Sequence, residues 1–131
     1  SVAAPDTREF EDWFAQEWWP QFADRWPHPP AENSRQDRIL RFAYARRGGA
    51  EPYGDEGYPA HLHIDLLAEL QGQGFGRKLI TTVSTALRDA GVAGLHLVAS
   101  AANTGALVFY DRIGFTRLPS DDGAQAFGIL L

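Results

Sequence analysis

The clearest chemical signal in the sequence is a glycine-rich segment, Gln71-Gly72-Gln73-Gly74-Phe75-Gly76-Arg77. It follows a strand-like run at 61–67 and precedes a helical pattern that ends near Ala90. This order leaves unpaired N–H groups at the start of a helix, where the helix dipole also favours negative charge. Glycine there allows a positive φ or a close approach to a ligand. Together with the cations Arg77 and Lys78, the segment predicts a phosphate-binding site.

Several folds place a glycine-rich turn after a strand, and the spacing of the glycines separates them. The nucleotide-binding P-loop requires G-x-x-x-x-G-K-[ST], which does not occur, and Arg77 stands where its lysine would follow Gly76. A Rossmann G-x-G-x-x-G that starts at Gly72 or Gly74 lacks its third glycine. The spacing that does fit is Gln-x-x-Gly-x-Gly, with Gln71 as its first residue.

Polar residues on the preceding strand are candidates for acid–base chemistry. Alternation along 61–67 puts one set of side chains on the face toward the ligand cleft: His61, His63, Asp65 and Leu67. A carboxylate among histidines on a central strand is unusual unless it is paired or working. Asp65 is the first candidate for a general base or substrate anchor, and His63 is the second. The alternative is that Asp65 and a histidine simply satisfy each other.

The elements that must position these residues are best defined in the second half of the chain. A strand is predicted at 94–100, and a helix capped by Asn103 or Thr104 runs to Ile113. Short strands follow at 115–118 and 124–131, the last one antiparallel. Two strands joined by a helix form a parallel βαβ unit. The pattern predicts an α/β (α+β) fold with a mixed sheet around that unit.

The first 60 residues are predicted to be mostly helical. A helix over 7–26 carries an aromatic stripe and is kinked or divided at Pro20, and a second helix covers 31–46. The loop at 48–59 either covers a site or is a disordered connection. Only 1–4 resembles a strand. The prediction is one domain, in which a helical segment and loop at 1–60 precede a ligand-binding core at 61–131.

Composition restricts the classes of function. The chain has 131 residues, a net charge of −5 and no cysteine, so a disulfide scaffold, a thiolate metal site and a cysteine nucleophile are excluded. The acidic balance argues against nucleic acid as a partner, and no apolar run reaches the length of a membrane span. We expect no metal, a cytoplasmic location and a monomer or homodimer.

Two motifs in order resemble the GNAT superfamily of N-acetyltransferases. Gln71-x-x-Gly74-x-Gly76 is similar to its Q/R-x-x-G-x-G/A loop for acyl-coenzyme A. A second family signature is matched downstream by Asn103, Ala106, Phe109-Tyr110 and Gly114-Phe115. The resemblance covers about 60–118. Within the superfamily, the run 58–67 looks most like bacterial relatives of the acetyltransferase-like C-terminal domain of O-GlcNAcase.

The resemblance implies a set of residues that hold acetyl-coenzyme A: Leu66, Leu67, Gln71, Gly72, Gln73, Gly74, Phe75, Gly76, Arg77, Asn103 and Tyr110. Backbone N–H groups from Gln73 to Arg77 would bind the pyrophosphate, and main-chain groups near Leu66 and Leu67 would pair with the pantetheine arm. Tyr110 would protonate the departing thiolate, while Asp65 or His63 would accept the proton of the amine.

The implied activity is N-acetylation of an amine acceptor by direct attack in a ternary complex. The alternative is a catalytically silent pseudo-acetyltransferase that binds acetyl-coenzyme A or a partner without turnover. Two departures from the family bear on this. Many members have a small apolar residue where Asp65 stands, and the family usually has several strands before the loop-bearing strand. Either this chain is missing upstream strands, or it is a shortened variant that borrows them from a partner. If upstream strands are missing, residues 1–60 would be an insertion ahead of the strand at 61–67, and its helices and loop would wall the acceptor side.

Overall fold

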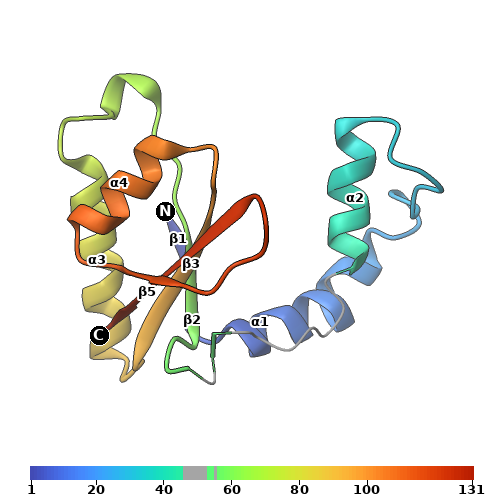
Figure 1. The fold of residues 1–131 in the computed structure, drawn as a ribbon. Helices are drawn as coiled ribbons and strands as arrows, with labels where there is room; N and C mark the ends of the chain where they lie inside the picture. Colours follow the sequence, from blue (N-terminus) through green and yellow to red (C-terminus); the bar gives the residue numbers. More distant parts are fainter. Residues whose placement is uncertain (46–52, 55) are drawn as a thin grey trace. The chain divides into compact units, whose positions relative to one another are not determined.

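A computed structural model describes residues 1–45, 53–54 and 56–131. The chain forms two compact units, each described here by itself. One unit combines 1–6 with 52–131 and contains the sheet, whereas the other comprises 7–51 and is helical (Figure 1). The helical unit is therefore an insertion between the first two strands in the sequence. That both units form a single acetyltransferase-like domain stays a prediction.

The sheet has five strands: β1 (Val2–Ala4), β2 (Ala60–His63), β3 (Gly94–Ser100), β4 (Thr116–Leu118) and β5 (Ala124–Leu130). Their order is β1-β2-β3-β5-β4. The pair β2–β3 is parallel, and the other three pairs are antiparallel. Helix α3 (Phe75–Asp89) connects the parallel strands. The predicted α/β fold and its parallel βαβ unit are confirmed, and the strand-like start at 1–4 is the edge strand β1.

The core lies between one face of the sheet and two helices. Leu95 and Leu97 of β3 and Phe127 of β5 belong to one buried cluster with Ile80 of α3 and Tyr110 of α4 (Thr104–Arg112). Since alternate strand residues share a face, α3 and α4 cover the same side of the sheet. Burying side chains of this size contributes about 1.5–3 kcal/mol each. This packing fixes the positions of both helices relative to β2 and β3.

The opposite face of the sheet is covered in part by the segment that leads into β2. Residues 53–54 and 56–59 make tight turns, and the ring of Tyr58 packs on Gly128. The backbone oxygen of Tyr58 also contacts Nδ1 of the buried His96 at 2.8 Å. The described part of the predicted loop is thus anchored on the sheet, while 46–52 and 55 lie outside the described residues.

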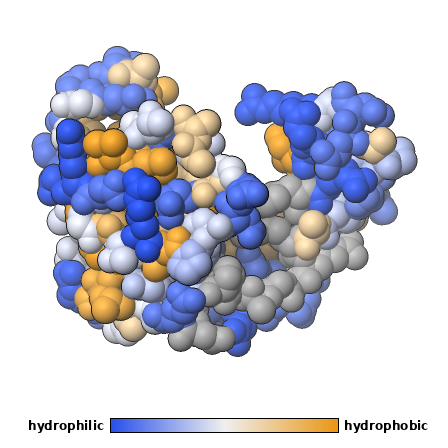
Figure 2. Space-filling model, in the orientation of Figure 1, coloured by the Kyte–Doolittle hydropathy of each residue, from blue (hydrophilic) through white to orange (hydrophobic). Residues whose placement is uncertain are grey.

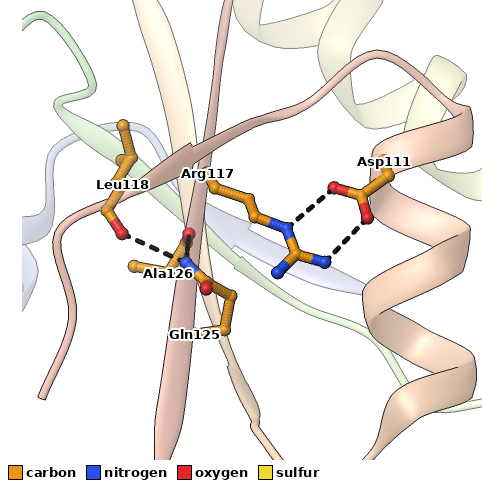
Figure 3. A network of polar contacts seen from close by, with 5 residues as sticks. All are labelled: Asp111, Arg117, Leu118, Gln125 and Ala126. Carbon is orange, nitrogen blue, oxygen red and sulfur yellow. Dashed lines mark hydrogen bonds and ion pairs between the residues drawn. The ribbon is translucent and has the colours of Figure 1, made fainter. Parts of the chain in front are cut away.

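A bidentate ion pair joins α4 to the neighbouring edge strand (Figure 3). The Arg117 guanidinium donates from Nε to Asp111 Oδ1 at 3.1 Å and from Nη2 to Oδ2 at 2.8 Å. Arg117 also lies 5.7 Å from the centre of the Phe127 ring. Nearby, Gln125 Nε2 donates to the carbonyl oxygens of Leu118 and Ala126. Both oxygens of the Asp111 carboxylate are therefore engaged by β4.

The predicted strand 61–67 is wrong in its length. Strand β2 ends at His63, where its antiparallel pairing with β1 ends, and its parallel pairing with β3 spans only Ala60–Leu95 and His61–His96. The burial of side chains nevertheless alternates as far as Leu67, after which Ala68–Leu70 form a 3₁₀ turn. Periodicity in sequence reports which side chains are buried and does not report whether the backbone is paired. The segment 64–67 is extended but outside the sheet.

The helical unit begins with three consecutive helical forms rather than an α-helix over the whole of 7–26. α1 (Thr7–Trp13) continues as a π-helix (Phe14–Trp18) and a 3₁₀ turn (Trp19–Gln21). Pro20 lies in that 3₁₀ turn, and the change of form removes the need for a hydrogen bond from its nitrogen. The predicted aromatic stripe is confirmed, with Trp18 stacked on Phe14.

The second helix of this unit, α2 (Arg35–Ala45), starts later than predicted. Its first turn is capped by Ser34, whose hydroxyl accepts a hydrogen bond from the N–H of Asp37 at 3.1 Å. Residue 46, where the predicted helix ended, lies outside the described residues.

The contact between Tyr58 and Gly128 predicts a specific sensitivity in the sheet. A Cβ at Gly128 would lie 2.7 Å from Tyr58 Cε1, so Gly128→Ala should lower the free energy of unfolding by about 1–3 kcal/mol. Gly105→Ala is the matched control, because its Cβ would have no neighbour closer than 3.8 Å, and should be neutral or stabilising. Urea denaturation measures both. Equal stability of the two variants would contradict the packing.

Candidate functional site

A pocket of about 570 Å³ lies in the sheet unit, where the chain leaves β2 and enters α3. One wall comes from 64–66, a second from the glycine turn and the start of α3, and a third from α4 and its cap. Figure 2 shows apolar residues beside strongly hydrophilic ones in the region where Figure 1 draws α4. The lining is Ile64, Asp65, Leu66, Gln71, Gly72, Gly74, Gly76, Arg77, Asn103, Gly105, Ala106, Phe109, Tyr110, Arg112 and Ile113.

The glycines of the turn have two different structural roles. Gly72 and Gly74 have φ values of +73° and +83°, in the left-handed region that other residues rarely adopt. Gly76 has no positive φ, but a Cβ there would lie 3.0 Å from Phe109 Cζ and 3.4 Å from Leu66 Cδ1. The first two glycines shape the turn. The third lets α4 and the segment after β2 pack closely on the start of α3.

The turn presents a row of backbone donors. Lys78 N–H donates to Gly74 O at 3.1 Å, which is the first hydrogen bond of α3. Because helical N–H groups bond four residues back, those of 75–77 have no acceptor within the helix. Gln71 steadies the turn, since its Nε2 donates to Leu66 O at 3.2 Å. Gln73 Nε2 donates to Glu69 O. The donors at the N-terminus of α3 are thus held in a braced loop.

The segment after β2 adds a second set of backbone donors. In the part of the chain that the structure describes, the N–H groups of 65–67 have no hydrogen-bond partner. Strand β3 continues to Ser100 beside them, yet its pairing with β2 stops at His96. The two strands therefore separate toward the pocket. An extended ligand can pair with this free edge as an added strand does.

Helix α4 contributes polar groups to the third wall. Asn103 is its N-cap, and the side-chain oxygen accepts from Ala106 N at 3.1 Å. Of the two predicted caps, Asn103 is the one used. Its side-chain amide nitrogen donates to no described residue and lies at the pocket. The cap therefore fixes the Asn103 side chain while leaving its donor end available.

Tyr110 has a buried ring and an accessible hydroxyl. The residue is 7% exposed and packs against Phe109, Phe115 and Phe127. The Tyr110 hydroxyl makes no hydrogen bond to a described residue. It is not among the buried side-chain atoms that lack a partner, since Trp19 Nε1 is the only such atom within the described residues. The hydroxyl is therefore not sealed in the core. Burial, and secondarily the charge of Asp65, raise the pKa of Tyr110 above its ordinary value of 10.0.

Asp65 and His63 form a pair at the mouth of the pocket. His63 Nε2 lies 2.8 Å from Asp65 Oδ2, and their side chains are 75% and 87% exposed. The expectation that Asp65 lies on a central strand is wrong, because Asp65 follows the end of β2. The alternative of a mutually satisfied pair describes the geometry. Asp65 nevertheless lines the pocket, whereas His63 does not.

Most of the predicted site residues meet in this pocket, and four do not line it: His63, Leu67, Gln73 and Phe75. Their roles stay predictions. Reasoning from sequence missed Ile64, Gly105, Arg112 and Ile113. Helical spacing could have found the last two, since Arg112 lies three residues after Phe109 and Ile113 three after Tyr110.

The described residues contain no group of three or more His, Cys, Asp or Glu side chains arranged to hold a metal ion. No helix among them is long and apolar enough to cross a membrane.

The environment of Tyr110 predicts how it titrates. Because its pKa is raised, the unfolded chain ionises first as pH rises above about 10, and the contribution of Tyr110 to stability is lost there. Asp65→Asn should lower the pKa of Tyr110 toward 10.0 without reaching it, because burial is the larger cause. Tyrosinate absorbance, taken as wild type minus Tyr110→Phe, measures this. Ionisation of Tyr110 at or below pH 10.0 in the wild type would contradict the burial of this residue.

Comparisons with known proteins show to which family the chain belongs. The acetyltransferase (GNAT) domain family matches residues 33–117. Mycothiol acetyltransferase of Rhodococcus opacus is 31% identical over 117 residues, which cover 83% of this chain and 37% of that protein. The [ribosomal protein bS18]-alanine N-acetyltransferase of Haemophilus ducreyi is 28% identical over 75% of this chain and 68% of its own length.

Solved structures extend the likeness to the helical unit. The crystal structure of SsHAT has a TM-score of 0.88 and 36% identity, covering 98% of this chain and 63% of that one. PaiA N-acetyltransferase of Thermoplasma acidophilum, solved in complex with coenzyme A, shares the fold at a TM-score of 0.56 and 12% identity, over 99% of this chain and 98% of its own. This chain spans less than two thirds of SsHAT and of the Rhodococcus protein. Since the family match covers more than half of it, the chain belongs to the GNAT acetyltransferase family.

Proposed function

We propose that this chain binds acetyl-coenzyme A and transfers its acetyl group to an amine by direct attack in a ternary complex. The observation that carries the proposal is the convergence of two sets of backbone donors on one pocket. One set lies at the start of α3, where Gly76 and Arg77 line the pocket, and the other lies after β2, where Asp65 and Leu66 line it. A pyrophosphate joined to an extended amide chain has the chemistry to use both sets.

The donors at 75–77 suit a diphosphate. Backbone N–H groups at a helix N-terminus bind anions without a side-chain cation. The positive φ values of Gly72 and Gly74 shape the turn that leads to these N–H groups. The amides of pantetheine would pair with the free edge at 65–67, as a strand does. Asn103, fixed by its capping bond, can reach the same arm from α4. One of the N–H groups near Leu66 would stabilise the oxyanion formed on the thioester carbonyl.

Tyr110 and Asp65 supply the proton transfers. The neutral amine attacks the thioester carbon, so an N–C bond forms and the C–S bond breaks. The proton lost by the amine passes to the Asp65–His63 pair, directly or through water. The Tyr110 hydroxyl gives its proton to the departing thiolate. Its raised pKa keeps the hydroxyl protonated at neutral pH, as this role requires.

The acceptor class follows from charge more than from shape. Asp65 contributes negative charge at the mouth of the pocket, and the chain carries a net charge of −5. Both features favour an acceptor amine that arrives as a cation. Three further expectations remain predictions: that the protein is a monomer or homodimer, that it is cytoplasmic, and that it has no nucleic-acid partner. The narrower likeness to the O-GlcNAcase C-terminal domain also remains a prediction, as does the idea that residues 1–60 help to select the acceptor.

Ligand-dependent stability tests whether acetyl-coenzyme A binds. At 100 times its Kd, acetyl-coenzyme A should raise the free energy of unfolding by about 2.7 kcal/mol, whereas ATP and NAD should not. Gly74→Ala should reduce that gain, because strain at φ +83° redirects the donors.

Gly91→Ala is the matched control for Gly74→Ala. Gly91 has φ +79° at the other end of α3, and a Cβ at either glycine would have nothing within 4 Å. The two variants should lose similar stability, but only Gly74→Ala should lose ligand binding. No response of the wild type to acetyl-coenzyme A would exclude the proposed function.

Replacing the Tyr110 hydroxyl should separate chemistry from binding. Tyr110→Phe keeps the packed ring, so the Kd for acetyl-coenzyme A should change little, while kcat with an amine acceptor should fall by about a hundredfold. Tyr58→Phe, a tyrosine on the opposite face of the sheet, is the control and should retain full kcat. Release of free thiol with a panel of amines measures turnover. An unchanged kcat for Tyr110→Phe would exclude the acid role, and binding without turnover in the wild type would favour the silent module.

A further inference from the structure

Two arginines line the pocket in addition to the backbone donors. Arg77 lies in the first turn of α3, and Arg112 lies in the last turn of α4. The Cβ position of Gly76 points at the Phe109 ring, so these two helices are in contact there. Arg77 follows Gly76 directly, and Arg112 shares a helix face with Phe109. The contact therefore brings both guanidinium-bearing residues to one part of the pocket.

The carboxylates nearest to Arg112 are engaged elsewhere. Its neighbour Asp111 uses both oxygens on Arg117, which holds the pKa of Asp111 below its usual value. Asp65 is the one carboxylate in the pocket lining, and it pairs with His63. Within the described residues, neither Arg77 nor Arg112 has an ion-pair partner. Both side chains are exposed and free to meet an anion.

Asp65 and the two arginines lie on different walls of the pocket. Asp65 follows β2 and acts on the ionisation of Tyr110, whereas Arg77 and Arg112 lie on α3 and α4, which approach each other at Gly76 and Phe109. The acidic side of the pocket is thus the side at which acetyl transfer is proposed. The basic side lies where α3 and α4 meet. A ligand that fits this arrangement has its reactive group on one side and excess negative charge on the other.

We infer that Arg112, together with Arg77, forms a second phosphate subsite that binds the 3′-phosphate of coenzyme A. This inference rests on the proposed function and adds to it. The pyrophosphate is satisfied by the backbone donors at 75–77, which need no side-chain charge. The 3′-phosphate is a monoester that carries about −1.5 to −2 charges at pH 7. Two guanidinium groups match that charge and can bind its oxygens in pairs.

A ligand comparison tests the subsite in the full chain. Titration calorimetry measures the Kd of coenzyme A and of 3′-dephospho-coenzyme A, for the wild type and for Arg112→Gln. The wild type should bind coenzyme A about tenfold more tightly than the dephospho form, because two charge-assisted hydrogen bonds are lost with the phosphate. Arg112→Gln should lose most of this preference while binding the dephospho form as the wild type does. Arg112→Lys should retain part of it.

Arg88→Gln is the matched control. Arg88 is an exposed arginine in the last turn of α3, as Arg112 is in α4, but it does not line the pocket. Both changes remove one charge from a helix C-terminus and should alter stability similarly. Only Arg112→Gln should alter the preference between the two ligands. If Arg112 only stabilises the C-terminus of α4, Arg112→Gln would leave the preference for coenzyme A over its dephospho form intact, and this result would overturn the inference.

The other outcomes are distinct from one another. If the wild type binds both ligands equally, or if Arg112→Gln weakens both equally, the subsite is excluded while the proposed function stands. If the wild type binds neither ligand, the inference and the proposed function both fail.

Discussion

The site depends on one feature of the sheet, which is that β2 and β3 pair over only two residues before they separate. Backbone N–H groups strongly require partners, and those that stay unpaired within a fold are either hydrated or used by a ligand. Here the separation leaves 65–67 without partners among the described residues, beside a longer strand that continues to Ser100. The glycine turn and the start of α3 lie directly after this segment in the chain. The two sets of donors therefore cannot be positioned independently of each other.

The core holds that separation in place. Leu95, Leu97 and Phe127 pack against α3 and α4, so the helices stay on one face of the sheet while the mouth of the pocket stays open. Gly76 allows α4 to approach α3 at the turn, and the Asp111–Arg117 pair joins α4 to β4. An exposed pair of this kind contributes little by itself, but its bidentate geometry orients α4. Tyr110 and Asn103 thereby reach the pocket from one helix with fixed directions.

The sequence allowed the order of elements and the glycine turn to be predicted, because turn glycines and buried side chains leave strong local patterns. Asn103 as a cap followed from the same kind of local chemistry. The end of β2 could not be predicted, since alternation continues to Leu67 although β2 pairs with β3 only as far as His61 and with β1 only as far as His63. The three helical forms in 7–21 were also missed, because the aromatic spacing suits an α-helix and only Pro20 marks the change. The role inferred for Arg112 was missed, because helical spacing places Arg112 beside Phe109 but does not reveal the contact between Phe109 and Gly76 of α3.

Amide hydrogen exchange with and without coenzyme A tests the central claim most directly, since it reads each backbone N–H separately. Slower exchange in the complex at both 65–67 and 72–77, with β5 unchanged, is the result that the structure predicts. Protection confined to 72–77 would show that the open edge of β2 is not used. Protection at neither segment would contradict the account of the site as a whole.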